Sequence, residues 1–190
     1  WPILGLFVGA ASTAIIQSSS ATIGILQELY TTGAIPLIGA IAIVFGDNIG
    51  TTVTAVFASI GGSIAAKRTA AAHVVFNLLG SIIFMIFLVP YTGFIQFLED
   101  KFIDISDPNN MKLTISFAHM AFNIFNTFIM FFFIKQLVWL VTKIVKGEDN
   151  IIKVDVDSLN DDLIVEAPVL ALESAKIVIA NMGKLTEQMF

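Results

Sequence analysis

Four consecutive polar residues, Gln17 to Ser20, interrupt an otherwise apolar amino-terminal part of this chain. Polar groups left unpaired in hydrocarbon are costly, so these side chains are expected to face one another, a water-filled cavity or a ligand. The apolar stretches on either side, residues 3–16 and 20–33, are each shorter than the roughly 20 residues that a straight membrane span requires. The pattern therefore predicts a re-entrant helical hairpin over residues 3–33, with Gln17 to Ser20 at its tip.

A second polar cluster lies within the apolar stretch 36–60, where Gly46 and Gly50 bracket Asp47 and Asn48. This stretch is long enough to span a membrane, and the glycines favour a helix that is kinked or unwound at mid-membrane. An ionisable side chain at that depth is functional by default. Two polar-centred, broken apolar segments of this kind are typical of the binding site of a transporter.

The composition supports a membrane protein, because hydrophobic residues make up 56% of the chain and charged residues only 13%. Two further spans are predicted at about 69–89 and 112–134, with a loop or short amphipathic helix over 94–110 between them and a continuation of the second span through Trp139. Both spans contain the pattern A-H-x-x-F-N, at His73 and His119. We expect these histidines to be packing residues rather than metal ligands, because neither helix offers a third ligand nearby.

The positive charges predict the orientation. Lys67 and Arg68 precede one span and Lys143 and Lys146 follow the next, so both groups fall on the same side, which the positive-inside rule assigns to the cytoplasm. Residues 91–110 are then external, and the chain is a multi-pass protein of the cell (inner) membrane. Glu28, near the end of a short half-helix, is expected at the interface.

The carboxyl-terminal part is different, since nine of the fifteen acidic residues follow Lys146. We expect three regions: a membrane region over 1–146, an acidic cytoplasmic linker over 147–166, and an amphipathic soluble helix over 167–190 that begins at Pro168. The chain begins directly on an apolar segment and ends within a helical pattern, as expected of a part of a longer protein.

Other functional classes are disfavoured. The sequence has no basic patch, which argues against nucleic-acid binding, and no cysteine for a disulfide or a thiolate metal site. A serine of the tip with His73 could form a hydrolytic dyad, but there is no G-x-S-x-G motif and none of the three serines is distinguished as a nucleophile. We therefore expect no enzyme. A regulatory membrane protein, whose tail senses and whose spans anchor, stays open as the alternative to a transporter.

Three motifs resemble the bacterial sodium/phosphate cotransporter family, which is related to the type II transporters of animals. They are Q-S-S-S-A-T from Gln17, G-x-N-I-G-T-T-V-T-A from Gly46, and R-x-A-x-x-H-x-x-F-N from Arg68. Their order and spacing also fit, so the resemblance covers roughly residues 1–145. The helix that starts at Pro168 is similar to the opening helix of the PhoU-like domain of many bacterial members.

The resemblance implies an all-α membrane protein that performs sodium-coupled phosphate symport by alternating access, built from two inverted repeats that each carry one Q-S-S-S hairpin. This sequence shows one such unit, the carboxyl-terminal one, so a second repeat or a second copy (a homodimer) must complete the site. Sodium is the coupling ion and no other cofactor is expected. The predicted phosphate ligands are Gln17, Ser18, Ser19 and Ser20, and the predicted sodium ligands are Gln17, Asp47, Asn48, Thr51 and Thr52.

Each of these predicted sites also has a purely structural interpretation. Gln17 to Ser20 could serve as polar contacts between membrane helices, and the cluster from Gly46 to Thr52 could be a glycine kink capped by polar residues. Asp47 departs from the family pattern, which usually has Ala or Ser there, and this puts the number or charge of the bound cations in doubt.

Overall fold

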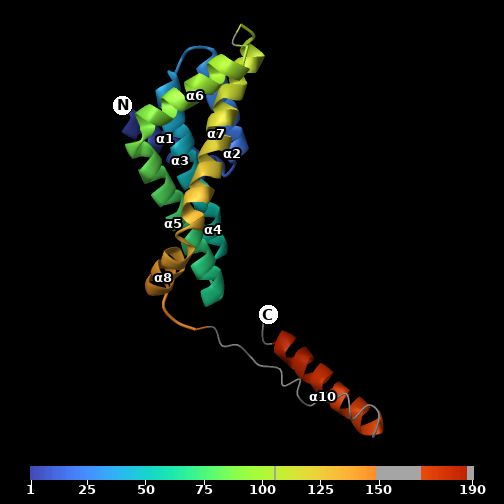
Figure 1. Cartoon of the computed structure of the whole chain (residues 1–190). Helices are drawn as coiled ribbons and strands as arrows, with labels where there is room; N and C mark the ends of the chain where they lie inside the picture. Colours follow the sequence, from blue (N-terminus) through green and yellow to red (C-terminus); the bar gives the residue numbers. More distant parts are fainter. Residues whose placement is uncertain (105, 149–167, 188–190) are drawn as a thin grey trace. The chain divides into compact units, whose positions relative to one another are not determined.

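The computed structural model describes residues 1–104, 106–148 and 168–187. It divides into two compact units, residues 1–148 and 149–190, and every regular element within the described residues is a helix (Figure 1). Three described helical stretches are long and apolar enough to cross a membrane: Leu37–Ala58, Ile64–Ile86 and Asn110–Phe131. The expectation of an all-α membrane protein is confirmed at this level.

The amino-terminal hairpin consists of α1 (Pro2–Ile16) and α2 (Ser19–Thr31), which meet at Gln17 and Ser18. Gln17 ends α1 in the left-handed conformation, with φ of 56°. Ser18 is the N-cap of α2, and its side-chain oxygen accepts a hydrogen bond from the backbone N–H of Ala21 at 3.3 Å. A left-handed residue followed by an N-cap reverses the chain within two residues.

The third helix, α3 (Leu37–Gly50), runs parallel to α1 and packs closely against it. The sequence predicts a kinked or unwound helix here. Gly46 lies within α3, which is not unwound there, and the helix is interrupted directly after Gly50, its last residue. A Cβ atom at Gly46 would clash with the backbone of Leu6, and one at Gly50 with the backbone of Ala10. The glycines therefore serve to bring two helix backbones together, as small residues commonly do in membranes.

The span does have an interruption, but it is a single residue. Thr51 separates α3 from α4 (Thr52–Ala58) and keeps a right-handed helical backbone, with φ of −61° and ψ of −24°. Its N–H still donates to the carbonyl of Asp47 at 3.1 Å. The helix is thus locally distorted at Thr51 rather than opened at mid-membrane.

The remaining helices of the first unit are α5 (Ile64–Ile86), α6 (Leu88–Phe102), α7 (Pro108–Phe131) and α8 (Ile134–Ile144). The predicted boundaries need two corrections. The predicted loop or short amphipathic helix over 94–110 is a helix up to Phe102, and it starts earlier, at Leu88, because a proline such as Pro90 is tolerated in a first helical turn. The segment after Phe131 is a separate helix, α8, and not a continuation of the span.

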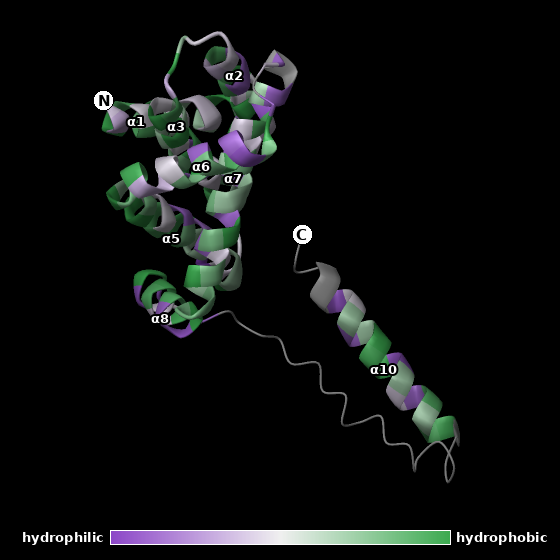
Figure 2. Cartoon of the chain, turned by 45° about the horizontal axis from the view of Figure 1, so that its top comes forward, coloured by the Kyte–Doolittle hydropathy of each residue, from purple (hydrophilic) through white to green (hydrophobic). Residues whose placement is uncertain are grey.

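An aromatic cluster holds four of these helices together. Phe45 of α3 contacts Phe84 of α5, Tyr91 of α6 and Phe122 of α7, with ring centroids 5.0–5.8 Å apart. The Tyr91 hydroxyl donates to the carbonyl of Ala118 at 2.6 Å. Hydropathy along the ribbons shows how widely apolar residues are spread over these helices (Figure 2), as a bilayer requires.

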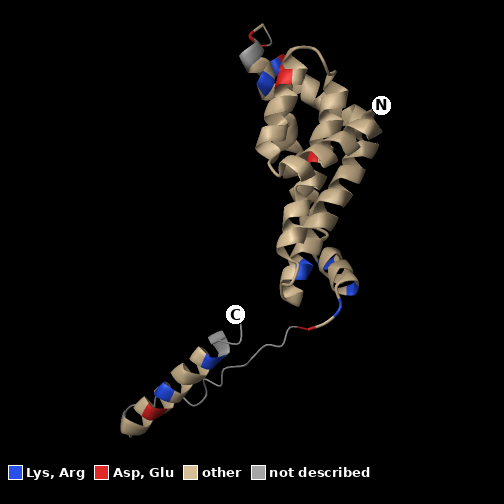
Figure 3. Cartoon of the chain, turned by 180° about the vertical axis from the view of Figure 1, so that it is seen from behind, with Lys and Arg blue, Asp and Glu red and all other residues tan. Residues whose placement is uncertain are grey.

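Most lysine and arginine residues of the first unit lie where α5 begins and along α8, at one end, with a smaller basic and acidic group at the other end (Figure 3). The Arg68 guanidinium donates to the carbonyls of Val145 at 3.2 Å and Gly147 at 2.8 Å, which ties these two regions together. At Glu28, in contrast, the carboxylate forms an ion pair with Lys112 at 2.6 Å. Lys67 and Arg68 therefore lie on the same side of the first unit as Lys143 and Lys146, as the sequence predicts.

In the second unit the described helix is α10 (Pro168–Glu187), so the helix predicted from Pro168 is confirmed. Leu172, Ile179 and Met182 of its predicted apolar stripe are exposed. Most of the predicted acidic linker, 147–166, lies outside the described residues, and only Gly147 and Glu148 of it are described.

Candidate functional site

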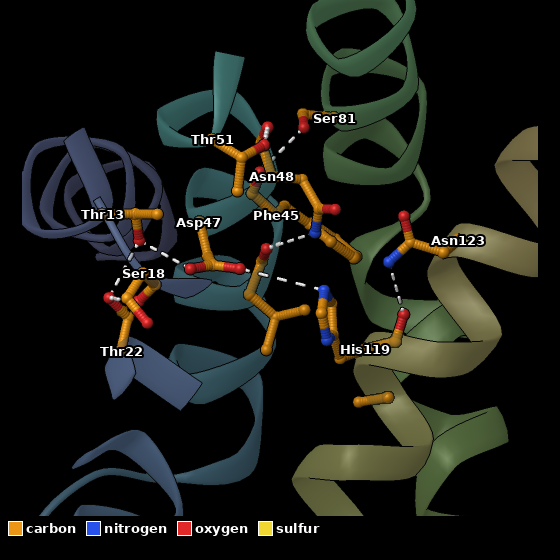
Figure 4. Close-up of polar contacts among 12 residues, drawn as sticks. Thr13, Ser18, Thr22, Phe45, Asp47, Asn48, Thr51, Ser81, His119 and Asn123 are labelled. Carbon is orange, nitrogen blue, oxygen red and sulfur yellow. Dashed lines mark hydrogen bonds and ion pairs between the residues drawn. The ribbon is translucent and has the colours of Figure 1, made fainter. Parts of the chain in front are cut away.

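The centre of the candidate site is a carboxylate buried between α1 and α3. Asp47 has no exposed surface, and its Oδ1 accepts a hydrogen bond from the hydroxyl of Thr13 at 2.6 Å. Thr13 itself is only 1% exposed. The close packing of α1 on α3 brings these two side chains together, because Gly9 lies against the backbone of Asp47. Figure 4 shows Thr13 pointing at Asp47 from the neighbouring helix.

The second oxygen of this carboxylate, Oδ2, is buried and has no hydrogen-bond partner among the described residues. Nε2 of His119 on α7 lies 3.8 Å from this oxygen, beyond hydrogen-bond distance (Figure 4). A buried oxygen that lacks a donor is costly. The site is therefore suited to a cation or a proton that would compensate the charge.

His119 was predicted to be a packing histidine, and its closeness to Asp47 is a feature that the sequence reading missed. The duplicated pattern does have a shared local role, since Asn77 donates to the carbonyl of His73 at 3.0 Å and Asn123 to that of His119 at 2.9 Å. The histidine side chains differ, however, because His73 is exposed. The two histidines differ in their surroundings because α7 packs against α3, and this packing brings His119 close to Asp47.

The tip of the hairpin extends the polar cluster around Asp47. The hydroxyl oxygens of Thr13 and Thr22 lie 3.1 Å apart. The Thr22 hydroxyl also lies 3.2 Å from the carbonyl oxygen of Ser18, to which it donates. Oxygens from α1, the tip, α2 and α3 thus form a continuous series of neighbours (Figure 4).

The predicted phosphate ligands lie at the outer surface of this tip. Gln17 and Ser20 are exposed, and Ser18 and Ser19 are half-buried. Among the described residues, the side chains of Gln17, Ser19 and Ser20 make no hydrogen bond, and that of Ser18 only caps α2. Within the described residues, these side chains therefore do not serve as polar contacts between helices.

The other predicted sodium ligands bond to their own helix. The Asn48 amide donates to the carbonyl of Val44 at 2.9 Å, the Thr51 hydroxyl to that of Asn48 at 2.7 Å, and the Thr52 hydroxyl to that of Ile49 at 2.7 Å. Figure 4 shows Asn48 on the side of α3 that faces away from Thr13. The structure brings Asp47 to the hairpin tip, and it does not bring Asn48 or Thr51 there.

A second buried carboxylate, Glu99, lies in the segment 94–110 that the sequence predicts to be a loop or short amphipathic helix. It lies on α6 and is only 6% exposed, and its Oε1 accepts hydrogen bonds from Tyr30 at 2.7 Å and Thr114 at 2.9 Å. The apolar spacing of Leu88, Tyr91 and Ile95 could have placed Glu99 on the buried face of a helix.

Comparisons with known proteins agree with this geometry. The family model described as Na+/Pi-cotransporter matches residues 1–99. The uncharacterized protein YqeW of Bacillus subtilis is 50% identical over 91 residues, which are 48% of this chain and 30% of that protein. YjbB of Salmonella typhimurium, provisionally named an inorganic phosphate export protein, is 26% identical over 98% of this chain and 33% of its own length.

An animal protein is also similar: the sodium-dependent phosphate transport protein 2A of Rattus norvegicus is 42% identical over 53 residues, 28% of this chain and 8% of that protein. The chain spans about a third or less of the length of these relatives. No solved structure matches it. The matched residues 1–99 cover just over half of the 190 residues and contain both the hairpin tip and Asp47, so this chain belongs to the Na+/Pi-cotransporter family.

Proposed function

We propose that this chain supplies one repeat of a sodium-coupled phosphate symporter that works by alternating access. The observation that carries the proposal is the position of the hairpin tip: through Thr13, it lies against the buried carboxylate of Asp47, halfway along the span Leu37–Ala58. A polar loop and a buried charge at the same depth of a membrane span are the arrangement that transporters use for substrate and coupling ion.

The hairpin is proposed to be re-entrant. Its helices have 15 and 13 residues, which at about 1.5 Å per residue gives lengths near 22 and 20 Å, short of the roughly 30 Å of hydrocarbon. Such a hairpin enters and leaves on the same side of the membrane. Its tip, Gln17 and Ser18, then lies within the bilayer and not beyond it.

Phosphate is proposed to bind at Gln17, Ser18, Ser19 and Ser20. The first backbone N–H groups of α2 and the positive end of its dipole suit an oxyanion. Because the Ser18 oxygen accepts the capping bond from Ala21, its own proton remains available for donation. The exposure of Gln17 and Ser20 fits a second, inverted repeat, on the same chain or in a second copy, whose equivalent loop closes the site.

Sodium is proposed to bind at Asp47 with Gln17, Asn48, Thr51 and Thr52. Moving one elementary charge against 100 mV costs about 2.3 kcal/mol, so an anion needs accompanying cations to accumulate in an inside-negative cell. The hydroxyls of Thr51 and Thr52 now donate to carbonyls of their own helix. Their oxygens keep lone pairs for a cation. To share one cation with Asp47, Asn48 would have to reorient, because it faces away from Thr13 in this structure.

The proposed location is the inner membrane, with the basic end at Lys67, Arg68 and Lys146 in the cytoplasm. Residues 1–146 are then the membrane repeat, 147–166 the cytoplasmic linker, and 167–190 the start of a PhoU-like regulatory domain. The names of the relatives state both sodium-dependent phosphate transport and phosphate export. A symporter follows its gradients, so an inward sodium gradient would favour uptake here.

The proposal is tested with the full-length protein in proteoliposomes. An inward sodium gradient should drive accumulation of radioactive phosphate inside them, and a potassium gradient should not. Phosphate movement that is equal in both gradients would refute sodium coupling, and the lack of any phosphate movement would refute the transport function.

A further inference from the structure

We infer that the hydroxyls of Thr13 and Thr22 and the backbone carbonyl of Ser18 complete the binding site of the coupling cation at Asp47. This inference rests on the proposed function and deepens it. It places the additional ligands on the hairpin, across the interface between α1 and α3. It gives a direct part in transport to Thr13, which lies outside the three motifs, and to Thr22, the last residue of the Q-S-S-S-A-T motif.

The first support for this inference is the distances between the oxygens. The oxygens follow one another at 2.6 Å from Asp47 to Thr13, at 3.1 Å from Thr13 to Thr22, and at 3.2 Å from Thr22 to the carbonyl of Ser18. Thr13, Thr22 and Asp47 are 1%, 5% and 0% exposed. Hard cations are held by several oxygens at about 2.3–2.6 Å from the metal. Successive oxygens in this series are separated by about the distance between two ligands of one cation, so movements that bring the Thr22 and Asp47 oxygens toward a common centre would complete the site.

The second support for the inference is the charge balance at Asp47. Only one carboxylate contributes, and its Oδ2 is buried without a hydrogen-bond donor among the described residues. One monovalent cation would neutralise this charge. Transition metals prefer imidazole or thiolate, and the described residues contain no group of three or more His, Cys, Asp or Glu side chains that could hold a metal ion. One carboxylate with neutral oxygens therefore suits sodium.

The arrangement also explains how the two substrates are coupled. The carbonyl of Ser18 faces Thr22, while its side chain caps α2 at the proposed phosphate site. A cation held by that carbonyl would fix the peptide that starts α2, and thereby the N–H groups that phosphate requires. Sodium and phosphate would then each raise the affinity for the other by the same factor, as linkage demands.

The test is sodium activation of phosphate uptake by the full-length protein in proteoliposomes. Thr13→Val and Thr22→Val each remove one hydroxyl with little change of volume. We expect each to raise the half-activating sodium concentration by about tenfold, which corresponds to about 1.4 kcal/mol, with maximal uptake largely kept at saturating sodium. Thr13→Ser and Thr22→Ser restore the hydroxyl and should stay within about twofold of the wild type, within the usual scatter of such effects.

The matched control is Thr114→Val. Thr114 is also a buried threonine that donates to a buried carboxylate, that of Glu99, but it lies outside the hairpin tip. It should leave sodium activation unchanged. If the wild type is activated by sodium and both valine variants at the tip behave like Thr114→Val, the inference is wrong and the proposed function stands. If one valine variant fails to insert into the membrane, the sodium activation of the other valine variant tests the inference. If both fail, Thr13→Ala and Thr22→Ala are compared with Thr13→Ser and Thr22→Ser in the same way. Phosphate uptake by the wild type that ignores sodium refutes the coupling itself.

Discussion

Gly46 of α3 lies directly against the backbone of Leu6 in α1, so closely that a methyl group on Gly46 would clash with the Leu6 carbonyl. The same relationship recurs one turn later between Gly50 and Ala10. These contacts decide how near the hairpin comes to Asp47. The glycines therefore determine the geometry of the site without touching a ligand.

The first prediction concerns this contact. Gly46→Ala should destabilise the protein by about 3 kcal/mol, because neither of the two helix backbones can give way easily. Gly93→Ala is the control, since a Cβ at Gly93 on α6 meets nothing within 4 Å; there alanine should stabilise the helix slightly. Thermal unfolding in detergent measures both. Equal midpoints for the two variants would contradict the close packing.

The sequence was sufficient to predict the helices around Gln17 and the three spans, because length and apolar content decide these elements. It did not predict the close packing of Gly46 and Gly50 on α1, because a glycine that permits a kink and a glycine that permits close packing look alike in one dimension. Only the parallel packing of α1 on α3 distinguishes the two roles.

The same limit applies to the site. Asp47 was singled out because a carboxylate within an apolar stretch is unusual. Thr13 was overlooked because single threonines are common in membrane helices, and Thr22 was noted only as the last residue of a motif, without a role in the site. The two copies of A-H-x-x-F-N could not tell His119 from His73. Which histidine approaches Asp47 depends on how α7 crosses α3, and no local pattern encodes that crossing.

The second prediction concerns the cluster at Glu99. Tyr30→Phe removes one of the two hydroxyls that donate to this buried carboxylate and should cost about 1–3 kcal/mol of stability. In the background of Glu99→Leu, the same change should cost much less, because no charge is left to satisfy. Thermal unfolding of the two single variants and the double variant measures the coupling. Strictly additive effects would show that the hydrogen bond between Tyr30 and Glu99 contributes nothing.

The third prediction concerns orientation. The sequence has no cysteine, so a single introduced cysteine reports one position. A cysteine at Asp104, an exposed residue beyond α6, should react with an impermeant maleimide added outside intact cells. A cysteine at Glu148 should react only after the membrane is opened. The reverse pattern would invert the proposed topology.

The fourth prediction concerns phosphate. Ser19→Ala should weaken phosphate binding by about 1–3 kcal/mol if its hydroxyl donates to the bound anion. At Ser18 the better substitution is glycine, because glycine costs an N-cap only a few tenths of a kcal/mol and still removes the hydroxyl. The concentration of phosphate that half-saturates uptake measures both. Normal values in both variants would remove these serines from the phosphate site.

The final prediction concerns Asp47, where sodium and phosphate are proposed to be coupled. The most direct measurement is the sodium dependence of phosphate uptake and the charge carried per phosphate, for the wild type and for Asp47→Asn, in proteoliposomes with the full-length protein. The variant should need more sodium or carry a different charge per phosphate, while its phosphate affinity at saturating sodium stays close to that of the wild type. Asn48→Ala should be the stronger lesion, because it removes the polar group shared with the family motif. Unchanged sodium activation together with an unchanged charge per phosphate in Asp47→Asn would contradict the assignment of Asp47 to the coupling site.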